Sequence, residues 1–151
     1  MMDSNFQILH FNVQKKGFSL PLAGIVEIIY FKPPMEVPHL HEPFKGVIDL
    51  RDKVIPVIDL RQLLEFKPAG DVPAEHILII KFKKTFMGLI VDEVKDVLYL
   101  SAGQLQPATF QHEEQNKYLR GIFKHKDELI MLLDLDRVMD LEAYQMLNQL
   151  V

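Results

Sequence analysis

The sequence of 151 residues contains no cysteine and no run of 18 apolar residues. Without cysteine, disulfide bridges, thiolate metal sites and cysteine nucleophiles are excluded, and a reducing compartment is favoured. Without a long apolar run, no segment is a candidate for a membrane-spanning helix. The first residues, MMDSNFQILHFNV, also lack the basic start and apolar core of a secretory signal. We therefore expect a cytoplasmic protein that is not inserted directly into a membrane.

An excess of basic residues is also missing. The chain has 17 lysines and arginines against 21 acidic residues, a net charge of −4. Nucleic-acid binding requires a clear local excess of positive charge, because the ligand is a chain of phosphates. The nearest basic run, residues 81–84 (KFKK), lies at the end of an expected strand and is interpreted as a solvated turn. Nucleic acid is therefore not expected as a partner.

Motifs for catalysis and cofactor binding are scarce. The seven glycines are dispersed and form no phosphate-binding loop, and none of Ser4, Ser19 and Ser101 lies in a nucleophile elbow. Asp59 and Arg61 could suggest acid catalysis, but a helix cap beside a surface charge explains them more simply. The sequence therefore favours a protein that is not an enzyme and has no cofactor.

Two histidines in the proline-rich segment PHLHEP could bind a metal ion. His39 and His41 are two residues apart, so on an extended segment their side chains point the same way. A third ligand would have to come from Glu42 or from a distant histidine. Incidental histidines in a proline-rich loop are the simpler interpretation, and no metal site is predicted.

Short apolar segments separated by Gly, Pro, Asp and Lys dominate the chain. Many alternate with a period of two and are rich in Val, Ile, Leu and Phe, which is typical of strands in a sandwich or small barrels. The expected strands include residues 6–13, 46–50, 54–58, 75–82, 86–91, 94–100, 118–123 and 128–133.

The sequence also contains a diverged duplication. GVIDLRDKVIPVIDLRQLL, residues 46–64, aligns without gaps with GIFKHKDELIMLLDLDRVM, residues 121–139, at an offset of 75. Upstream, FSLPLAGIVEIIYF (18–31) aligns with FMGLIVDEVKDVLY (86–99) at an offset of 68. Two copies of one β-rich unit are therefore predicted, and such repeats determine the architecture.

Each copy predicts a hairpin followed by a short helix. Asp52-Lys53 and Asp127-Glu128 are expected to supply the turns. Asp59 and Asp134 are expected to cap helices over residues 60–64 and 135–139. A further helix over residues 142–150 is predicted from its apolar stripe.

In order and spacing, these segments resemble the CheW family of bacterial chemotaxis coupling proteins, from about Asn5 to Met139. The most specific match is GVIDLRDKVIPVIDLR, residues 46–61, against a glycine, an apolar stretch, Leu-Arg-Gly and Pro-Val-x-Asp-Leu-Arg. IVEI (25–28), GLIVDEVKDVL (88–98), YLRGIF and LLDLDRV support it. Asp52 departs from the pattern, because the family has glycine at this turn. Asp is among the few residues that tolerate a positive φ there.

The resemblance implies a mainly β fold of two small five-stranded β-barrel lobes that share an apolar interface, with short helices and a C-terminal helix. It implies a single CheW-like domain over 1–151, with lobes of roughly 14–84 and of 1–13 plus 85–151, between which strands could be exchanged. It also implies a non-enzymatic adaptor that couples methyl-accepting chemoreceptors to the histidine kinase CheA. Such a protein would be recruited to the inner face of the membrane through the receptors.

The resemblance also indicates a receptor-binding surface. It pairs Arg51 with Glu27, and the expected receptor contacts are Arg51, Glu27, Ile25, Ile28, Asp52 and Val91. The cytoplasmic tip of the receptor would bind in a groove between the lobes, and the lobes themselves would contact CheA.

Two alternatives stay open from the sequence. One is a CheW-like adaptor of another receptor–kinase pathway, such as surface motility. The other is a small-molecule-binding or catalytic β-barrel, since a fold alone does not determine function. A deep polar pocket in which Asp59, Glu27 and His41 converge would favour this second alternative.

Overall fold

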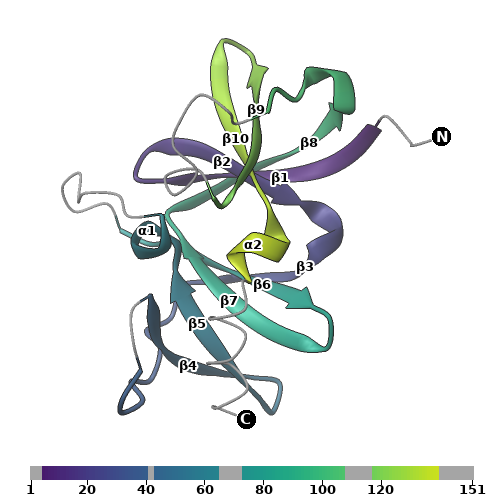
Figure 1. The fold of residues 1–151 in the computed structure, drawn as a ribbon. Coiled ribbons are helices and arrows are strands. Elements are labelled where there is room, and N and C mark those ends of the chain that lie inside the picture. The colour runs from purple at the N-terminus through teal and green to yellow at the C-terminus, as the bar shows by residue number, and fades with distance from the viewer. Residues whose placement is uncertain (1–4, 41–42, 65–72, 108–116, 140–151) are drawn as a thin grey trace.

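The computed structural model describes residues 5–40, 43–64, 73–107 and 117–139. The chain forms two five-stranded sheets, one above the other in Figure 1. Across sheet A the strands are β8 (Glu93–Ser101), β1 (Asn5–Val13), β2 (Lys16–Pro21), β10 (Glu128–Leu133) and β9 (Leu119–His125). Across sheet B they are β3 (Ile25–Tyr30), β6 (His76–Phe82), β7 (Thr85–Val91), β5 (Lys53–Asp59) and β4 (Phe44–Leu50). The mainly β fold with two five-stranded units is thus confirmed.

Tight turns join the hairpin strands. Arg51 and Asp52 have φ values of 52° and 66°, and Lys126 and Asp127 have 48° and 64°. Two consecutive positive φ values match the right-handed twist of a hairpin. The turns therefore lie one residue earlier than Asp52-Lys53 and Asp127-Glu128, because Lys53 and Glu128 already pair as strand residues. Asp52 takes the left-handed conformation in place of the family glycine, as expected.

The duplication is visible in the strand pairing. β4 and β5 correspond to β9 and β10 at the offset of 75, since Val47↔Pro56 and Ile122↔Met131 are both ladder pairs. The upstream offset of 68 is wrong by one residue. Tyr30 of β3 pairs with His76 of β6, and Tyr99 of β8 pairs with Gln7 of β1, so the two tyrosines are structural counterparts and the offset between equivalent residues is 69. An error of one residue matters because it moves every side chain to the opposite face of its strand.

The two copies exchange strands. β1 and β2 come from the first copy but complete sheet A, while β6 and β7 come from the second copy and complete sheet B. Parallel pairing of β2 with β10, and of β7 with β5, joins the copies in each sheet. The sheets therefore divide the chain within residues 22–24 and at Asp92, rather than at the expected boundaries 13/14 and 84/85.

Single bridges join the outer strands of each sheet. Met35, beyond β3, pairs with Val47 of β4, and Gln106, beyond β8, pairs with Ile122 of β9. In the described ranges these bridges are the only pairing between the outer strands, so closure into complete barrels stays a prediction. Each sheet is nevertheless strongly curved (Figure 1).

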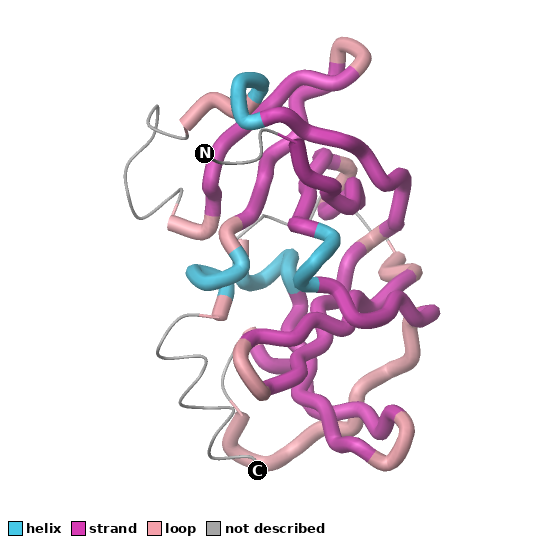
Figure 2. The backbone as a smooth tube through the Cα atoms, turned by 90° about the vertical axis from the view of Figure 1, so that its right-hand side faces the viewer, coloured by secondary structure: helices cyan, strands magenta, loops and turns pink. Residues whose placement is uncertain are grey.

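Short helices lie between the sheets, as Figure 2 shows. Asp59 accepts a hydrogen bond from the Arg61 N–H at 2.9 Å and begins α1 (Leu60–Leu63). Asp134 accepts one from the Asp136 N–H at 3.0 Å and begins α2 (Leu135–Val138). Both predicted caps are thereby confirmed. The helix predicted over 142–150 lies outside the described residues.

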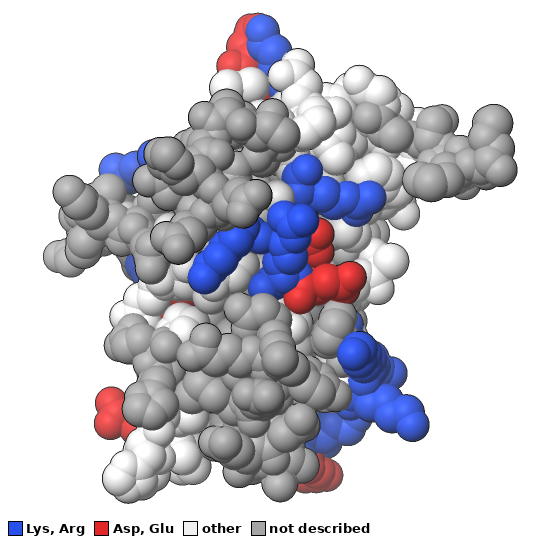
Figure 3. Space-filling view, in the orientation of Figure 1, with Lys and Arg blue, Asp and Glu red and all other residues white. Residues whose placement is uncertain are grey.

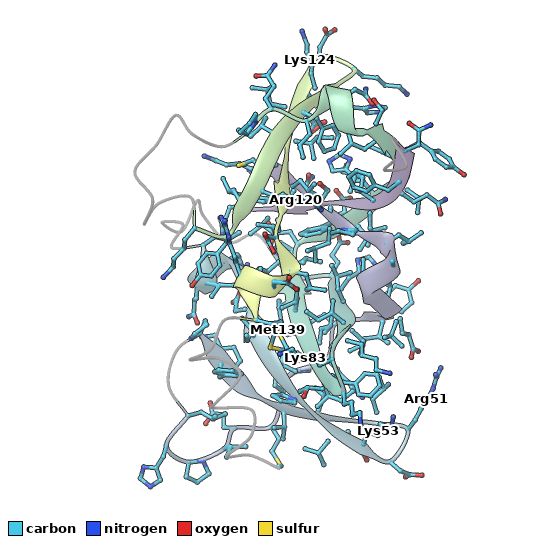
Figure 4. The ribbon with its side chains drawn as sticks, turned by 45° about the vertical axis from the view of Figure 1, so that its right-hand side comes forward. Arg51, Lys53, Lys83, Arg120, Lys124 and Met139 are labelled. Atoms are coloured by element: carbon cyan, nitrogen blue, oxygen red, sulfur yellow. The ribbon has the colours of Figure 1, made fainter. Side chains whose placement is uncertain are left out.

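The largest core cluster contains residues of both sheets and of both helices. Phe11, Leu60, Leu89 and Val138 are members, and Met139 lies between the sheets in Figure 4. Burial of these side chains supplies the main favourable free energy of folding. Within the described ranges, no helix is long and apolar enough to cross a membrane.

Candidate functional site

The predicted partner of Arg51 is in place at the edge of sheet B. Arg51 Nη2 donates a hydrogen bond to Glu27 Oε2 at 3.0 Å. The Arg51 side chain is 76% exposed, and it extends outward from the tip of the β4–β5 hairpin (Figure 4). A pair this exposed stabilises the fold by only about 0–1 kcal/mol. Its effect is therefore to orient two side chains on the surface.

Exposed apolar side chains lie next to Glu27 along β3. The strand alternates in exposure, so Val26, Ile28 and Tyr30 share one outward face, while Glu27 lies on the other, less exposed face with Ile29. Tyr30 is 83% exposed and stacks on His76, with ring centroids 5.5 Å apart. We define the β3 surface as Val26, Glu27, Ile28, Tyr30 and Arg51.

Three further predicted contacts have different environments. Ile25 is only partly exposed and packs against the main core. Val91 is completely buried in that core, so its assignment as a receptor contact is wrong. Asp52 is exposed in the turn next to Arg51. Val26 and Tyr30 were not among the predicted contacts, although alternation along residues 25–30 places them on the exposed face of Ile28.

A lysine fixes the hairpin beside the β3 surface. Lys32 Nζ donates a hydrogen bond to the Asp49 carbonyl oxygen at 2.9 Å. Asp49 lies two residues before Arg51 on the same hairpin, and Lys32 follows β3 in the chain. This contact therefore joins the two elements that carry Glu27 and Arg51.

The corresponding positions of sheet A form a related surface. At the structural offset of 69, Val97 and Tyr99 correspond to Ile28 and Tyr30, and all four are exposed. Tyr99 accepts a hydrogen bond from Gln7 Nε2 at 3.2 Å, where Tyr30 stacks on His76. Lys124, near the tip of β9–β10, and Arg51 lie at opposite ends of the molecule (Figure 4). The tips of the two corresponding hairpins therefore lie far apart.

A polar cluster lies where the chain passes from sheet B to sheet A. Arg61 Nε lies 3.3 Å from Asp59 Oδ1 and 3.8 Å from Asp92 Oδ1. Asp92 Oδ2 accepts a hydrogen bond from the Gln14 N–H at 2.6 Å. Burial raises the pKa of the Asp92 carboxyl, while the Gln14 hydrogen bond and the charge of Arg61 oppose this shift. Asp59 therefore pairs with Arg61, whereas Glu27 pairs with Arg51, so these two carboxylates of the polar-pocket alternative belong to different ion pairs.

His10 is a second buried titratable group, in sheet A. Burial lowers the pKa of His10 below 6.5 and outweighs the attraction of Glu128, whose Oε1 lies 3.8 Å from His10 Nε2. In the part of the chain that the structure describes, no three His, Asp or Glu side chains are placed to bind a metal ion. His41 and Glu42 of the PHLHEP segment lie outside that part.

Charge on the surface is uneven despite the small net value. In Figure 3, lysine and arginine side chains gather over the middle of the face in view and along its lower right, over sheet B. Lys53 and Lys81 of sheet B lie over the Phe86 ring, at 4.2 and 5.5 Å from its centroid. The surface beside the β4–β5 hairpin is therefore locally basic.

Comparisons with known proteins agree on one family. The sequence model of the family described as CheW-like domain matches residues 7–143. The chain is 30% identical to a probable chemotaxis protein CheW of Rhizobium etli, over 86% of this chain and 84% of that protein. It is 28% identical to chemotaxis protein CheW of Bacillus subtilis, over 92% and 90%.

A solved structure shares the fold. The crystal structure of the scaffolding protein TtCheW from Thermoanaerobacter tengcongensis superposes with a TM-score of 0.81 at 25% identity. The match covers 91% of this chain and 94% of the other. The similarity therefore includes both sheets.

Proposed function

Because this chain belongs to the family of CheW-like domains, we propose that it is a non-enzymatic adaptor in bacterial chemotaxis. The adaptor couples methyl-accepting chemoreceptors to a CheA-type histidine kinase. It catalyses no reaction, and it acts from the cytoplasmic side, where receptors hold it close to the membrane. The adaptor contributes a coupling free energy between receptor binding and kinase binding.

The observation that carries the receptor assignment is the Glu27–Arg51 ion pair on a strand whose other face exposes three apolar side chains. A helical hairpin that docks here would place apolar side chains against Val26, Ile28 and Tyr30. The ion pair would present the planar guanidinium of Arg51 in a fixed orientation, and a guanidinium can hydrogen-bond in a directed way to a polar group of the helix. The exposed Asp52 adds a negative charge at the edge of this surface.

The duplicated arrangement supports separate sites for two partners. Exposed apolar side chains occur at corresponding positions of both sheets, but the charges beside them differ. Arg51 corresponds to Lys126 at the offset of 75, and Glu27 corresponds to Asp96 at 69. Lys lacks the bidentate fork of Arg. We assign the β3 surface to the receptor and the surface of sheet A to the kinase.

A double-mutant cycle tests the receptor assignment. Binding of a receptor-tip fragment is measured for wild type, Glu27→Ala, Arg51→Ala and the double variant. Because the two side chains are in contact, we expect a coupling energy of at least about 0.5 kcal/mol. The matched control is the same cycle on the equivalent pair, Asp96 and Lys126, which should leave receptor affinity unchanged. Additive effects of Glu27 and Arg51 would remove the assignment.

A further inference from the structure

The chain passes between the sheets at two corresponding places that differ in chemistry. The first crossing, from β2 to β3, is the 3-10 turn η1 (Leu22–Gly24) and is apolar. A Cβ on Gly24 would lie 2.7 Å from Leu135 Cδ2 of α2, so the backbone there packs directly against the helix. The second crossing, from β7 to β8, is Asp92, which is 3% exposed. Only one of the two crossings thus contains a buried carboxyl group.

The main chain and side chain of Asp92 together hold parts of both sheets. Its N–H donates to the Asn12 carbonyl oxygen of β1 at 3.0 Å, and its side chain accepts from the Gln14 N–H at 2.6 Å. Its carbonyl oxygen accepts from the Glu75 N–H at 2.9 Å, at the entry to β6. One residue therefore contacts sheet A at two points and sheet B at one.

The other carboxylate oxygen of Asp92 faces α1. Oδ1 is buried, lacks a hydrogen bond and lies 3.8 Å from Arg61 Nε. Arg61 is held in turn by Asp59, the residue that caps α1. Because β5 and α1 belong to the sheet B side, the charge of Arg61 links that side to the Asp92 carboxylate.

We propose that Asp92, acting with Arg61, is a positioning residue that sets the orientation of sheet A relative to sheet B. Removing one partner from a buried ion pair leaves an uncompensated charge, whereas an apolar replacement of the whole pair is often neutral or stabilising. The pair is therefore a weak source of stability and a directional contact between the sheets. For signalling, which rests on the function proposed above, this orientation fixes how the receptor and kinase surfaces lie relative to each other.

The test uses the absence of cysteine, which lets spin labels be placed at chosen sites. Labels at Asp49→Cys and Lys124→Cys, both exposed and at equivalent positions of β4 and β9, report the distance between the sheets. Wild type should give one narrow distance distribution. Asp92→Asn should broaden it, because the amide cannot attract Arg61 as a carboxylate does.

Two further variants complete the experiment. Arg61→Gln should broaden the distribution in the same way, and the double variant should add little, since both changes remove the same contact. The matched control is Asp136→Asn, which replaces an exposed carboxyl group of α2 and not the buried one at the second crossing. Urea midpoints should fall in both single variants, because each change leaves one buried partner unpaired, so the distances are compared without denaturant, where every variant is folded. A purely structural role would lower the midpoint and leave the distance distribution narrow. A distribution identical to wild type in Asp92→Asn overturns the proposal.

The signalling consequence is measured separately. In a reconstituted assembly, Asp92→Asn should keep its affinity for each partner alone, while the receptor-dependent change in kinase activity falls at least about fivefold. An unchanged response would remove the link to signalling. If wild type binds neither partner, the function proposed above fails, and the distance measurement still decides the role of Asp92.

Discussion

Gly46 is predicted to be the least replaceable glycine of the described chain. Its φ is +143°, and a Cβ there would lie 2.1 Å from the Met35 carbonyl oxygen. A residue other than glycine at such a φ costs about 1–3 kcal/mol. The added methyl group would also push Met35 away from Val47 and break the two hydrogen bonds of their bridge, which measure 2.8 and 2.9 Å.

Each of these hydrogen bonds contributes about 0.5–1.5 kcal/mol, so Gly46→Ala should lower the free energy of unfolding by about 2–6 kcal/mol in total. The chain offers two internal comparisons. Gly121 holds the corresponding bridge, and its Cβ would lie 2.5 Å from the Gln106 carbonyl oxygen, but it has no positive φ. Gly121→Ala should therefore cost only about 1–3 kcal/mol.

Gly103, in η2 (Ala102–Gln104), has no atom within 4 Å of an added Cβ, so Gly103→Ala should change stability by less than about 0.5 kcal/mol. Urea denaturation followed by far-UV circular dichroism gives the three values. Hydrogen exchange at the Val47 amide reports the bridge directly. If Gly46→Ala and Gly103→Ala unfold at the same urea concentration, the account of the bridge is refuted.

Three further predictions concern stability. Because burial lowers the pKa of His10 in the native state, the unfolded state binds more protons just below pH 6.5, so stability should fall on acidification through that range. In a plot of urea midpoint against pH, His10→Gln should reduce the slope in the same range. An unchanged slope would contradict the lowered pKa of His10. Asp59→Ala should cost about 1–2 kcal/mol and the more exposed Asp134→Ala about 0.5–1, measured by urea denaturation; the reverse order would count against the role of burial. Val91→Ala should lower the free energy of unfolding by about 1–3 kcal/mol and leave receptor affinity unchanged. Ile28→Ala should lower it by less than about 1 kcal/mol and weaken receptor binding. A Val91→Ala variant with wild-type stability would contradict the burial of Val91.

Regular alternation and turn residues let much of the fold be predicted. The hairpins follow from their turn residues, and the short helices follow from the capping residues Asp59 and Asp134. Both signals occur in each copy of the duplication. The upstream offset failed because β2 and β7, at the start of the two aligned segments, are buried on both faces along most of their length. The composition of such segments does not tell one face from the other, and only the ladder pairing does.

Val91 was assigned as an apolar residue of the second aligned segment, and residue type alone does not show whether such a side chain is exposed. Val91 belongs to the last, buried part of β7, whereas the exposed counterpart of Ile28 at the structural offset of 69 is Val97. The Glu27–Arg51 pair was predicted from the family pattern, not from spacing. The contact between Arg61 and Asp92 joins residues far apart in the chain, and neither residue type nor position indicated it.

The central claim is that this chain transmits receptor state to a kinase without catalysing a reaction. The most direct measurement is phosphorylation by a CheA-type kinase mixed with receptor fragments, with and without this protein. Kinase activity should respond to the receptor only when wild-type protein is present, and Arg51→Glu should abolish that response while kinase binding persists. A receptor-dependent response that is equal with and without the protein would contradict the claim.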